Sequence, residues 1–159
     1  MTEGMSKNEI KKATKDFILN EFTNKGMTII ERSAGAVGYQ AIRFSENSQW
    51  NIACIYGGRG VGASIWVRDN VLQALKESGL ISKESHNVED VSFFKRGLDW
   101  KIDIVDFNDS VIPQIVNLSV ELHLPLYQKE QESAKLKAEK QAKADARKAK
   151  MDLKRKSAF

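Results

Sequence analysis

Apolar residues recur at helical spacing near the start of the chain, and capping signals stand at both ends of the run. The stripe consists of Ile10, Ala13, Phe17, Ile18 and Phe22. This spacing is typical of an amphipathic α-helix with one face toward a core. Ser6 and Glu9 have the separation of a capping box, and Gly26 is well placed to end the helix. A first helix is therefore predicted between Ser6 and Gly26.

Strand signals follow the first helix and are separated by turn residues. The four runs cover residues 27–31, 37–44, 50–56 and 63–67. Alternation within the second run places Gln40 and Ile42 on one face of a strand. Tyr39 and Arg43 fall on the opposite face. Because the connections are short, these strands are predicted to pair as an antiparallel meander.

Two further helices are predicted, over residues 69–79 and 110–123. In the former, Asn70 and Gln73 have capping-box spacing, and Gly79 is placed to end the helix. In the latter, Pro113 suits the first turn, where its missing N–H costs no intrahelical hydrogen bond. Pro125 is predicted to close this helix, because proline removes a hydrogen bond from a helix interior.

The segment between these two helices is predicted in two parts. Residues 87–94 suit a short helix whose two phenylalanines fill the core. Residues 99–107 alternate, with Ile102 on one face and Lys101 and Asp103 on the other. Such alternation predicts a half-buried strand.

The predicted order of elements, α-β-β-β-β-α-β-α, indicates an α+β fold. The sheet is expected to be mainly antiparallel, with four to five strands and about three helices on one face. The globular domain is predicted to cover residues 1–127, which is near the commonest size for a domain with its own core.

The last segment, residues 128–159, differs in composition from the domain before it. Glycine and proline are absent, while alanine, lysine, glutamate and glutamine dominate, and these are strong helix formers. It holds 11 of the 25 lysines and arginines and 5 of the 21 acidic residues, a net charge of +6. The domain keeps 14 basic and 16 acidic residues, a net charge of −2. An extended, helical C-terminal arm, partly disordered when free, is therefore predicted.

The charge of the arm predicts an acidic partner, with nucleic acid first among the candidates. The predicted contact residues are Lys140, Lys143, Arg147, Lys148, Lys150, Lys154, Arg155 and Lys156. An alanine stripe along the arm would bury too little area for a stable coiled coil, and no leucine seam is present. A solvated tail that only aids solubility is the alternative interpretation.

The glycine-rich segment 57–62 is predicted to be a hairpin turn with glycines at positive φ. A phosphate-binding loop would lead into a helix and end in Gly-Lys-Ser or Gly-Lys-Thr. Here a strand run follows, and the segment contains no lysine. Arg59, between glycines at the loop tip, is predicted as a further contact for a phosphate or a carboxylate.

Asp99 and Lys101 have the acid-x-lysine spacing of metal-dependent nucleases, with Glu89 and Asp90 upstream. Such an enzyme needs two carboxylates that hold Mg²⁺ and a lysine beside the attacking water. The pair lies on the last predicted strand, however, whereas a site of this kind is expected in the middle of the sheet order. An exposed strand face explains the same residues, so a catalytic role for this pair is left open.

The remaining reactive side chains are explained by structural roles. Cys54 lies in an apolar strand run without a neighbouring base or cation, which predicts a buried thiol in a reducing compartment. Neither His86 nor His123 has a second ligand at metal-binding distance in the sequence, so no metal or cofactor is predicted. His123 is expected to cap its helix or to complement the helix dipole.

Aromatic residues near Arg43 suggest one more binding surface. Tyr39 shares a predicted strand face with Arg43, and Trp50 and Tyr56 stand nearby in the sequence. Surfaces that stack nucleobases combine exposed aromatics with cations in this way. Aromatics on strands also fill cores, and the negative charge of the domain favours that second interpretation.

We therefore expect a non-enzymatic binding protein that associates with nucleic acid through its arm. A protein-binding inhibitor or adaptor acting through the α+β domain is the alternative, and a metal-dependent nuclease is a lesser one. No apolar stretch approaches the ~20 residues that span a bilayer, and the first residues lack the apolar run of a signal peptide. A cytoplasmic protein without membrane contact is expected, in an oligomeric state that the sequence leaves open.

Overall fold

The computed structural model describes residues 4–34, 37–56, 62–81, 86–92, 98–105 and 107–157. The chain divides into two compact units, Met1–Leu124 and Pro125–Phe159. Most of the glycine-rich segment, including Arg59, and the two phenylalanines at 93 and 94 lie outside the described residues.

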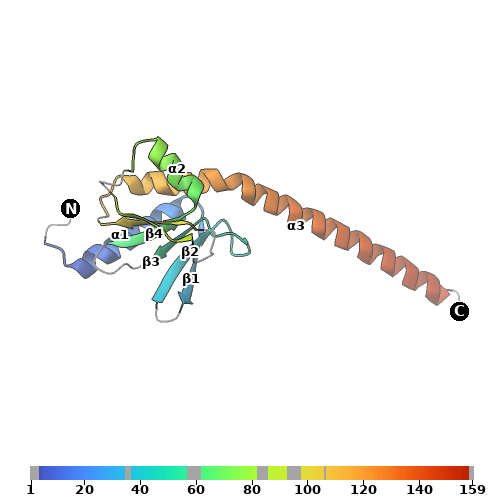
Figure 1. Ribbon diagram of the computed structural model, residues 1–159. Coiled ribbons are helices and arrows are strands. Elements are labelled where there is room, and N and C mark those ends of the chain that lie inside the picture. The colour runs from blue at the N-terminus through green and yellow to red at the C-terminus, as the bar shows by residue number, and fades with distance from the viewer. Residues whose placement is uncertain are drawn as a thin grey trace. The chain divides into compact units, whose positions relative to one another are not determined.

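The described residues form three helices and six strands (Figure 1). In chain order these are α1 (Lys7–Asn24), β1 (Thr28–Ala34), β2 (Val37–Arg43), β3 (Ala53–Tyr56), β4 (Ala63–Val67), α2 (Asp69–Glu77), β5 (Val88–Asp90), β6 (Trp100–Ile104) and α3 (Val111–Ser157). The strands form one sheet in the order β1-β2-β3-β4-β6-β5, and every neighbouring pair is antiparallel. The predicted α+β class and antiparallel meander are confirmed, and the sheet has one strand more than the largest number predicted.

Helix α1 begins and ends where the capping signals predict. The backbone N–H of Glu9 donates to Ser6 Oγ at 3.2 Å, and the N–H of Ser6 donates to Glu9 Oε1 at 3.4 Å. This reciprocal pair satisfies donors that the start of a helix otherwise leaves to water. At the other end, Gly26 has a φ of 82°, a left-handed conformation that favours glycine.

One face of the sheet carries the main core, and all three helices pack against that face. Its buried strand residues are Ile42, Ala53, Ile55, Ala63, Ile65, Val67, Ile102 and Ile104. The helices contribute Ile18, Phe22, Val71, Leu72, Leu75, Val111, Ile112, Ile115 and Val116 to the same cluster. Burial of each large aliphatic side chain contributes roughly 1.5–3 kcal/mol, so this layer supplies most of the apolar stabilisation.

A smaller cluster forms on the opposite face of the sheet. Ala41, Cys54 and Trp66 come from three neighbouring strands and are covered by Val91 and Leu98. Cys54 is fully buried and is not part of a disulfide, as the apolar run around it predicts. We call this face the open face, because no helix residue that the structure describes belongs to its cluster.

The prediction of a short helix over residues 87–94 is wrong for the described part of this segment, because Val88–Asp90 form strand β5. Val88 lies opposite Ile102 in the register, and Glu89 lies opposite Lys101. Three residues are too few to show a period of their own, so the local pattern cannot separate strand from helix. The backbone partner that makes this segment a strand is β6, which follows it in the chain.

Helix α2 occupies the predicted residues and ends before Gly79, whose φ is 76°. The predicted capping box is wrong, however. Asn70 lies within the first turn and its Oδ1 accepts from the N–H of Val71 at 2.9 Å, while the Gln73 amide donates to Asp69 Oδ1 at 3.4 Å. The N-cap residue is Arg68, which makes no side-chain capping hydrogen bond. Because Arg68 directly follows β4, the end of that strand sets the start of the helix.

Helix α3 contains Pro125 and continues to Ser157, so the prediction that Pro125 closes the helix is wrong. Proline removes one backbone donor, at a cost of about 3 kcal/mol in a helix interior. The carbonyl that loses this donor belongs to Glu121, which is exposed and can be hydrated. The residues after Pro125 are strong helix formers and resume the hydrogen-bond ladder. The helix therefore tolerates the proline.

Gly62, at the end of the glycine-rich segment, is required by close packing and not by backbone conformation. Gly62 does not have a positive φ, so the prediction that this position needs glycine for a left-handed backbone conformation is wrong. A Cβ added to Gly62 would lie 2.8 Å from Thr14 Oγ1 and 2.9 Å from the carbonyl oxygen of Val105, and closer still to that of Ile104. Only glycine lets β4 start this close to α1 and to the end of β6.

We predict that Gly62→Ala lowers the free energy of unfolding by about 1–3 kcal/mol, because backbone atoms must move to admit the methyl group. Gly38→Ala is the matched control, since a Cβ there would meet only the Arg32 carbonyl at 3.8 Å. Urea denaturation of both variants checks the difference. Equal midpoints for the two variants would contradict the close-packing explanation.

Candidate functional site

The eight predicted arm residues all lie on the exposed helical segment that belongs to the unit Pro125–Phe159. At about 100° per residue, five of them fall within an arc of roughly 80°. These five residues, which we call the basic stripe, are Lys140, Lys143, Arg147, Lys150 and Lys154. The stripe is roughly 21 Å long at the helical rise of about 1.5 Å per residue. Lys148, Arg155 and Lys156 lie outside it.

Acidic residues near the basic stripe lie mostly on the far side of the helix, and Glu139 lies at the margin of the stripe, about 20° outside the arc and one turn before Lys143. From Leu136 to Ser157, no acidic residue falls within the arc of the stripe. Asp145 and Asp152 lie roughly 160–180° from its middle, and the Gln141 side chain donates to Asp145 Oδ1 at 3.0 Å. One side of the helix therefore carries five cations, with Glu139 at its margin.

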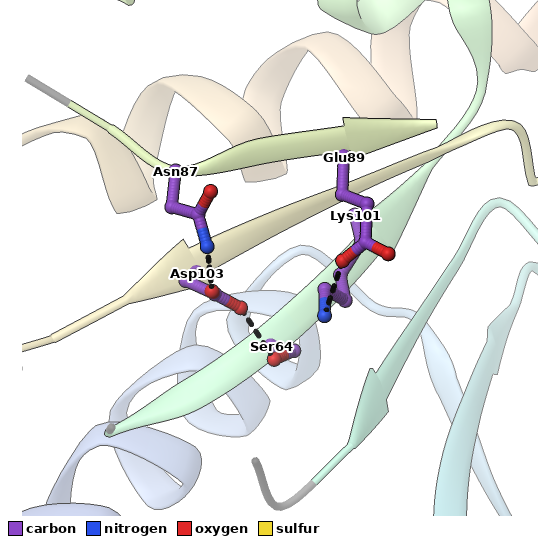
Figure 2. Close-up of polar contacts among 5 residues, drawn as sticks. All are labelled: Ser64, Asn87, Glu89, Lys101 and Asp103. Carbon is purple, nitrogen blue, oxygen red and sulfur yellow. Dashed lines mark hydrogen bonds and ion pairs between the residues drawn. The ribbon is translucent and has the colours of Figure 1, made fainter. Parts of the chain in front are cut away.

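The open face of the sheet carries a polar cluster built on β6 (Figure 2). Ser64 Oγ donates to Asp103 Oδ1 at 2.7 Å, and Asn87 Nδ2 donates to Asp103 Oδ2 at 2.6 Å. Lys101 Nζ lies 2.8 Å from Glu89 Oε2. The hydrogen bond that Lys101 donates to Glu89 raises the pKa of Lys101, against the opposing effect of burial. These contacts tie β4, β6 and the short edge strand β5 together.

The predicted alternation on β6 is confirmed, whereas the acid-x-lysine pair does not form a joint site. Lys101 pairs with Glu89, while Asp99 precedes β6 and lies near Arg68. No group of three or more His, Cys, Asp or Glu side chains suited to a metal ion is present among the described residues. Strand β6 is last along the chain but lies between β4 and β5 in the sheet. The geometry of the cluster is that of a structural network.

Sequence reasoning missed the role of Ser64 and Asn87 in this network. Ser64 lies 39 residues before Asp103 in the chain, and its hydroxyl is buried. Asn87 lies 16 residues before Asp103. No spacing rule links such positions, because the antiparallel pairing of β6 with two different strands brings them together. The one available signal was the alternation that placed Asp103 on the polar side.

The aromatic residues of the open face form a packed row. The ring centroids of Tyr39 and Tyr56 are 5.1 Å apart in a stacked arrangement, and those of Tyr56 and Trp66 are 4.6 Å apart. Trp66 is only 8% exposed. The core interpretation therefore describes this row better than an open stacking platform. Trp50 differs, because half of its surface is exposed.

Asn51 joins two arginines at one end of the open face. Arg43 Nε donates to Asn51 Oδ1 at 2.7 Å, and Arg68 Nε donates to the backbone oxygen of Asn51 at 3.1 Å. The Arg68 guanidinium lies 5.6 Å from the centre of the Trp50 ring. We call Arg43, Asn51, Arg68 and Trp50 the arginine corner. The predicted strand 50–56 begins only at Ala53, so Trp50 and Asn51 lie in a connection and not in the sheet.

His123 is buried in the middle of α3, so its predicted role at a helix end is wrong. Its Nδ1 donates to the Ser119 carbonyl at 2.7 Å, because a carbonyl oxygen can only accept. Its Nε2 has no hydrogen-bond partner in the described part of the chain. Burial lowers the pKa of His123, the hydrogen bond to Ser119 opposes this effect, and the Arg68 charge adds to it.

Comparisons with protein-family models, with curated proteins and with solved structures found no match to this chain. Within the described residues, no helix combines the length and the apolar character needed to cross a membrane.

We predict that Asp103→Ala lowers the free energy of unfolding by about 1–3 kcal/mol, because it leaves the buried Ser64 hydroxyl without its acceptor. Glu89→Ala is the matched control on the same face and removes a partly exposed ion pair worth about 0–1 kcal/mol. Urea denaturation measures both. If Ser64→Ala and Asp103→Ala have fully additive effects in the double variant, the proposed coupling between these side chains is wrong.

We also predict that His123 makes the fold less stable in acid. Below the ordinary histidine pKa of about 6.5, the unfolded chain binds a proton that the folded chain resists, so unfolding becomes more favourable as pH falls. The wild-type protein should lose more stability than His123→Leu between about pH 7.5 and about pH 5. Urea midpoints across this range check the slope, and parallel curves for the two proteins would contradict it.

Proposed function

We propose that this protein binds nucleic acid without strong sequence preference, through the basic stripe of α3. The observation that carries the proposal is the arrangement of five cations on one side of an exposed helix, with Asp145 and Asp152 on the opposite side. A polyanion that contacts such a line releases its condensed counterions, which favours binding. Because phosphate contacts carry no base information, the stripe alone predicts weak sequence preference.

The amino-acid composition supports a stripe that is present before binding. Alanine, lysine, glutamate and glutamine have high helix propensity, and three cations in the last turn complement the helix dipole. A helix that is already formed presents its cations in one line without a further ordering cost. Of the eight arm residues expected to contact nucleic acid, the five of the stripe carry the main contribution in this proposal.

A protein-binding role for the globular unit is the second candidate. The observation that favours it is an edge strand, β1, beside a hollow lined by Glu31, Arg32, Gly38, Tyr39 and Gln40. An exposed strand edge offers backbone groups to an extended peptide. Exposed charged side chains on β1 discourage such pairing, however, so the nucleic-acid proposal is preferred.

A cytoplasmic location is part of the proposal. It is supported by the single cysteine, Cys54, which is buried and is not part of a disulfide. A protein that works in a reducing compartment gains nothing from disulfides, and this chain relies on its apolar core.

We predict that replacing the five stripe cations by glutamine weakens binding to DNA and RNA. Glutamine keeps the helix, and the loss of up to five phosphate contacts should flatten the dependence of affinity on salt. The measurement is a fluorescence-anisotropy titration of the full chain at two salt concentrations, with circular dichroism to check the helix.

The matched control removes five other cations from the same helix, namely Lys135, Lys137, Lys148, Arg155 and Lys156. Both variants lose the same charge, so they differ only in where the cations lie around the helix. The stripe variant should bind about tenfold more weakly than the control or worse. Unchanged affinity of the stripe variant would overturn the nucleic-acid proposal, and equal losses in the two variants would overturn the assignment to the stripe.

A further inference from the structure

In the arginine corner, the Arg68 cation is partly buried and has no ion-pair partner among the described residues. Arg68 is half-buried, and burial lowers its pKa, while Asp99 acts on it only as a nearby charge. Neither Arg43 nor Arg68 takes part in an ion pair among the described residues. A half-buried cation in this condition is stabilised by any anion that reaches it.

The donors of the two arginines are only partly used within the protein. Arg68 donates through Nε alone, and Arg43 donates through Nε to Asn51 and through Nη1 to the backbone oxygen of Ser48 at 3.1 Å. The two terminal nitrogens of Arg68 and the Nη2 of Arg43 make no hydrogen bond to the described residues. Guanidinium groups with free terminal nitrogens match the oxygens of a phosphate.

Trp50 offers an aromatic face beside these donors. One side of its ring has the Arg68 guanidinium at 5.6 Å from the centroid, and half of the residue surface is exposed. The Arg68 cation therefore lies over one face of the indole, while half of the residue surface remains accessible to solvent. An exposed indole face next to free cationic donors is the combination that stacks a nucleobase.

The connection that carries Trp50 is held in place before any ligand arrives. Ser48 is 4% exposed, its N–H donates to the Ser45 carbonyl at 3.1 Å, and its own carbonyl accepts from Arg43. Asn51 is held from both sides by the two arginines. A surface fixed in this way loses little conformational entropy on binding.

We propose that the arginine corner binds one nucleotide of a single-stranded nucleic acid, with the base stacked on Trp50 and its phosphate held by Arg43 and Arg68. This inference rests on the proposed nucleic-acid function and extends it to the globular unit. A single strand is required, because the bases of a duplex have both faces covered by their neighbours. The corner thus distinguishes single-stranded from double-stranded nucleic acid, whereas the basic stripe contacts the phosphates of both.

The test uses the full chain, a labelled oligothymidylate of about 15 nucleotides and a labelled duplex. Trp50→Leu should weaken single-strand binding by roughly 5- to 150-fold, the range for loss of one stacked base. Binding to the duplex should not change. Arg68→Gln should act in the same direction, and Arg32→Gln, which removes an exposed arginine from β1, is the matched control.

A second readout separates stacking from a structural role of the tryptophan. Oligothymidylate should quench the intrinsic fluorescence of the wild-type protein and of Trp100→Phe, and the quenching should be lost in Trp50→Phe. Thermal unfolding checks that each variant is folded. If Arg68→Gln does not fold, Trp50→Leu alone decides, because its exposed side chain can be removed without opening the core.

The outcomes for the two proposals are distinguishable. Wild-type single-strand affinity and quenching in the Trp50 variants, together with a loss in the stripe variant, would overturn the corner and leave the proposed function standing. Equal losses for single strand and duplex in Trp50→Leu would also overturn it. Unchanged binding in the stripe variant would overturn the proposed function instead.

Discussion

The pleat of β4 and β6 is the constraint on which the rest of the globular unit depends. Successive side chains of a strand point to opposite faces. Because Ile65, Ile102 and Ile104 must enter the core beneath the helices, the residues between them must face the other way. Ser64, Trp66, Lys101 and Asp103 are therefore placed together on the open face by the burial of their neighbours. Pairing of β4 with β6 then brings Ser64 opposite Asp103, within hydrogen-bond distance.

The helices pack against one face of the sheet, so other residues must cover the open face. Its middle is apolar and is covered by Val91 and Leu98, while β6 closes one side with hydrogen bonds and an ion pair. The arginine corner, at the other polar end of this face, differs from the β6 cluster. Its two arginines form no ion pair with a carboxylate among the described residues. A network in which every group has its partner stabilises the fold, whereas cations with spare donors favour an anionic ligand. This difference separates a structural cluster from a candidate binding site on the same face.

Charge is divided unevenly between the two units. The globular unit is slightly acidic as a whole, so in the proposed function the attraction to a polyanion comes from the arm and falls off with salt. The proposed site at Arg43, Arg68 and Trp50 would add short-range selection that net charge does not reveal. In the proposal, weak attraction over a line of phosphates and selection of an unpaired base are separable contributions to binding.

The sequence by itself determined the elements whose signals are local. The capping box at Ser6 and Glu9, the strand alternation, and the buried thiol of Cys54 followed from period and neighbours alone. The line of cations on the arm likewise follows from a spacing of three and four residues. Tertiary structure decided what needed a distant partner: β5 exists because β6 pairs with it, Ser64 and Asn87 meet on Asp103, and Asn51 joins Arg43 to Arg68. It also buried His123. The continuation of α3 past Pro125 has a local reason instead, because strong helix formers follow the proline and Glu121, whose carbonyl loses its donor, is an exposed residue. Local patterns fix periods, and only the folded chain fixes which residues from different strands meet.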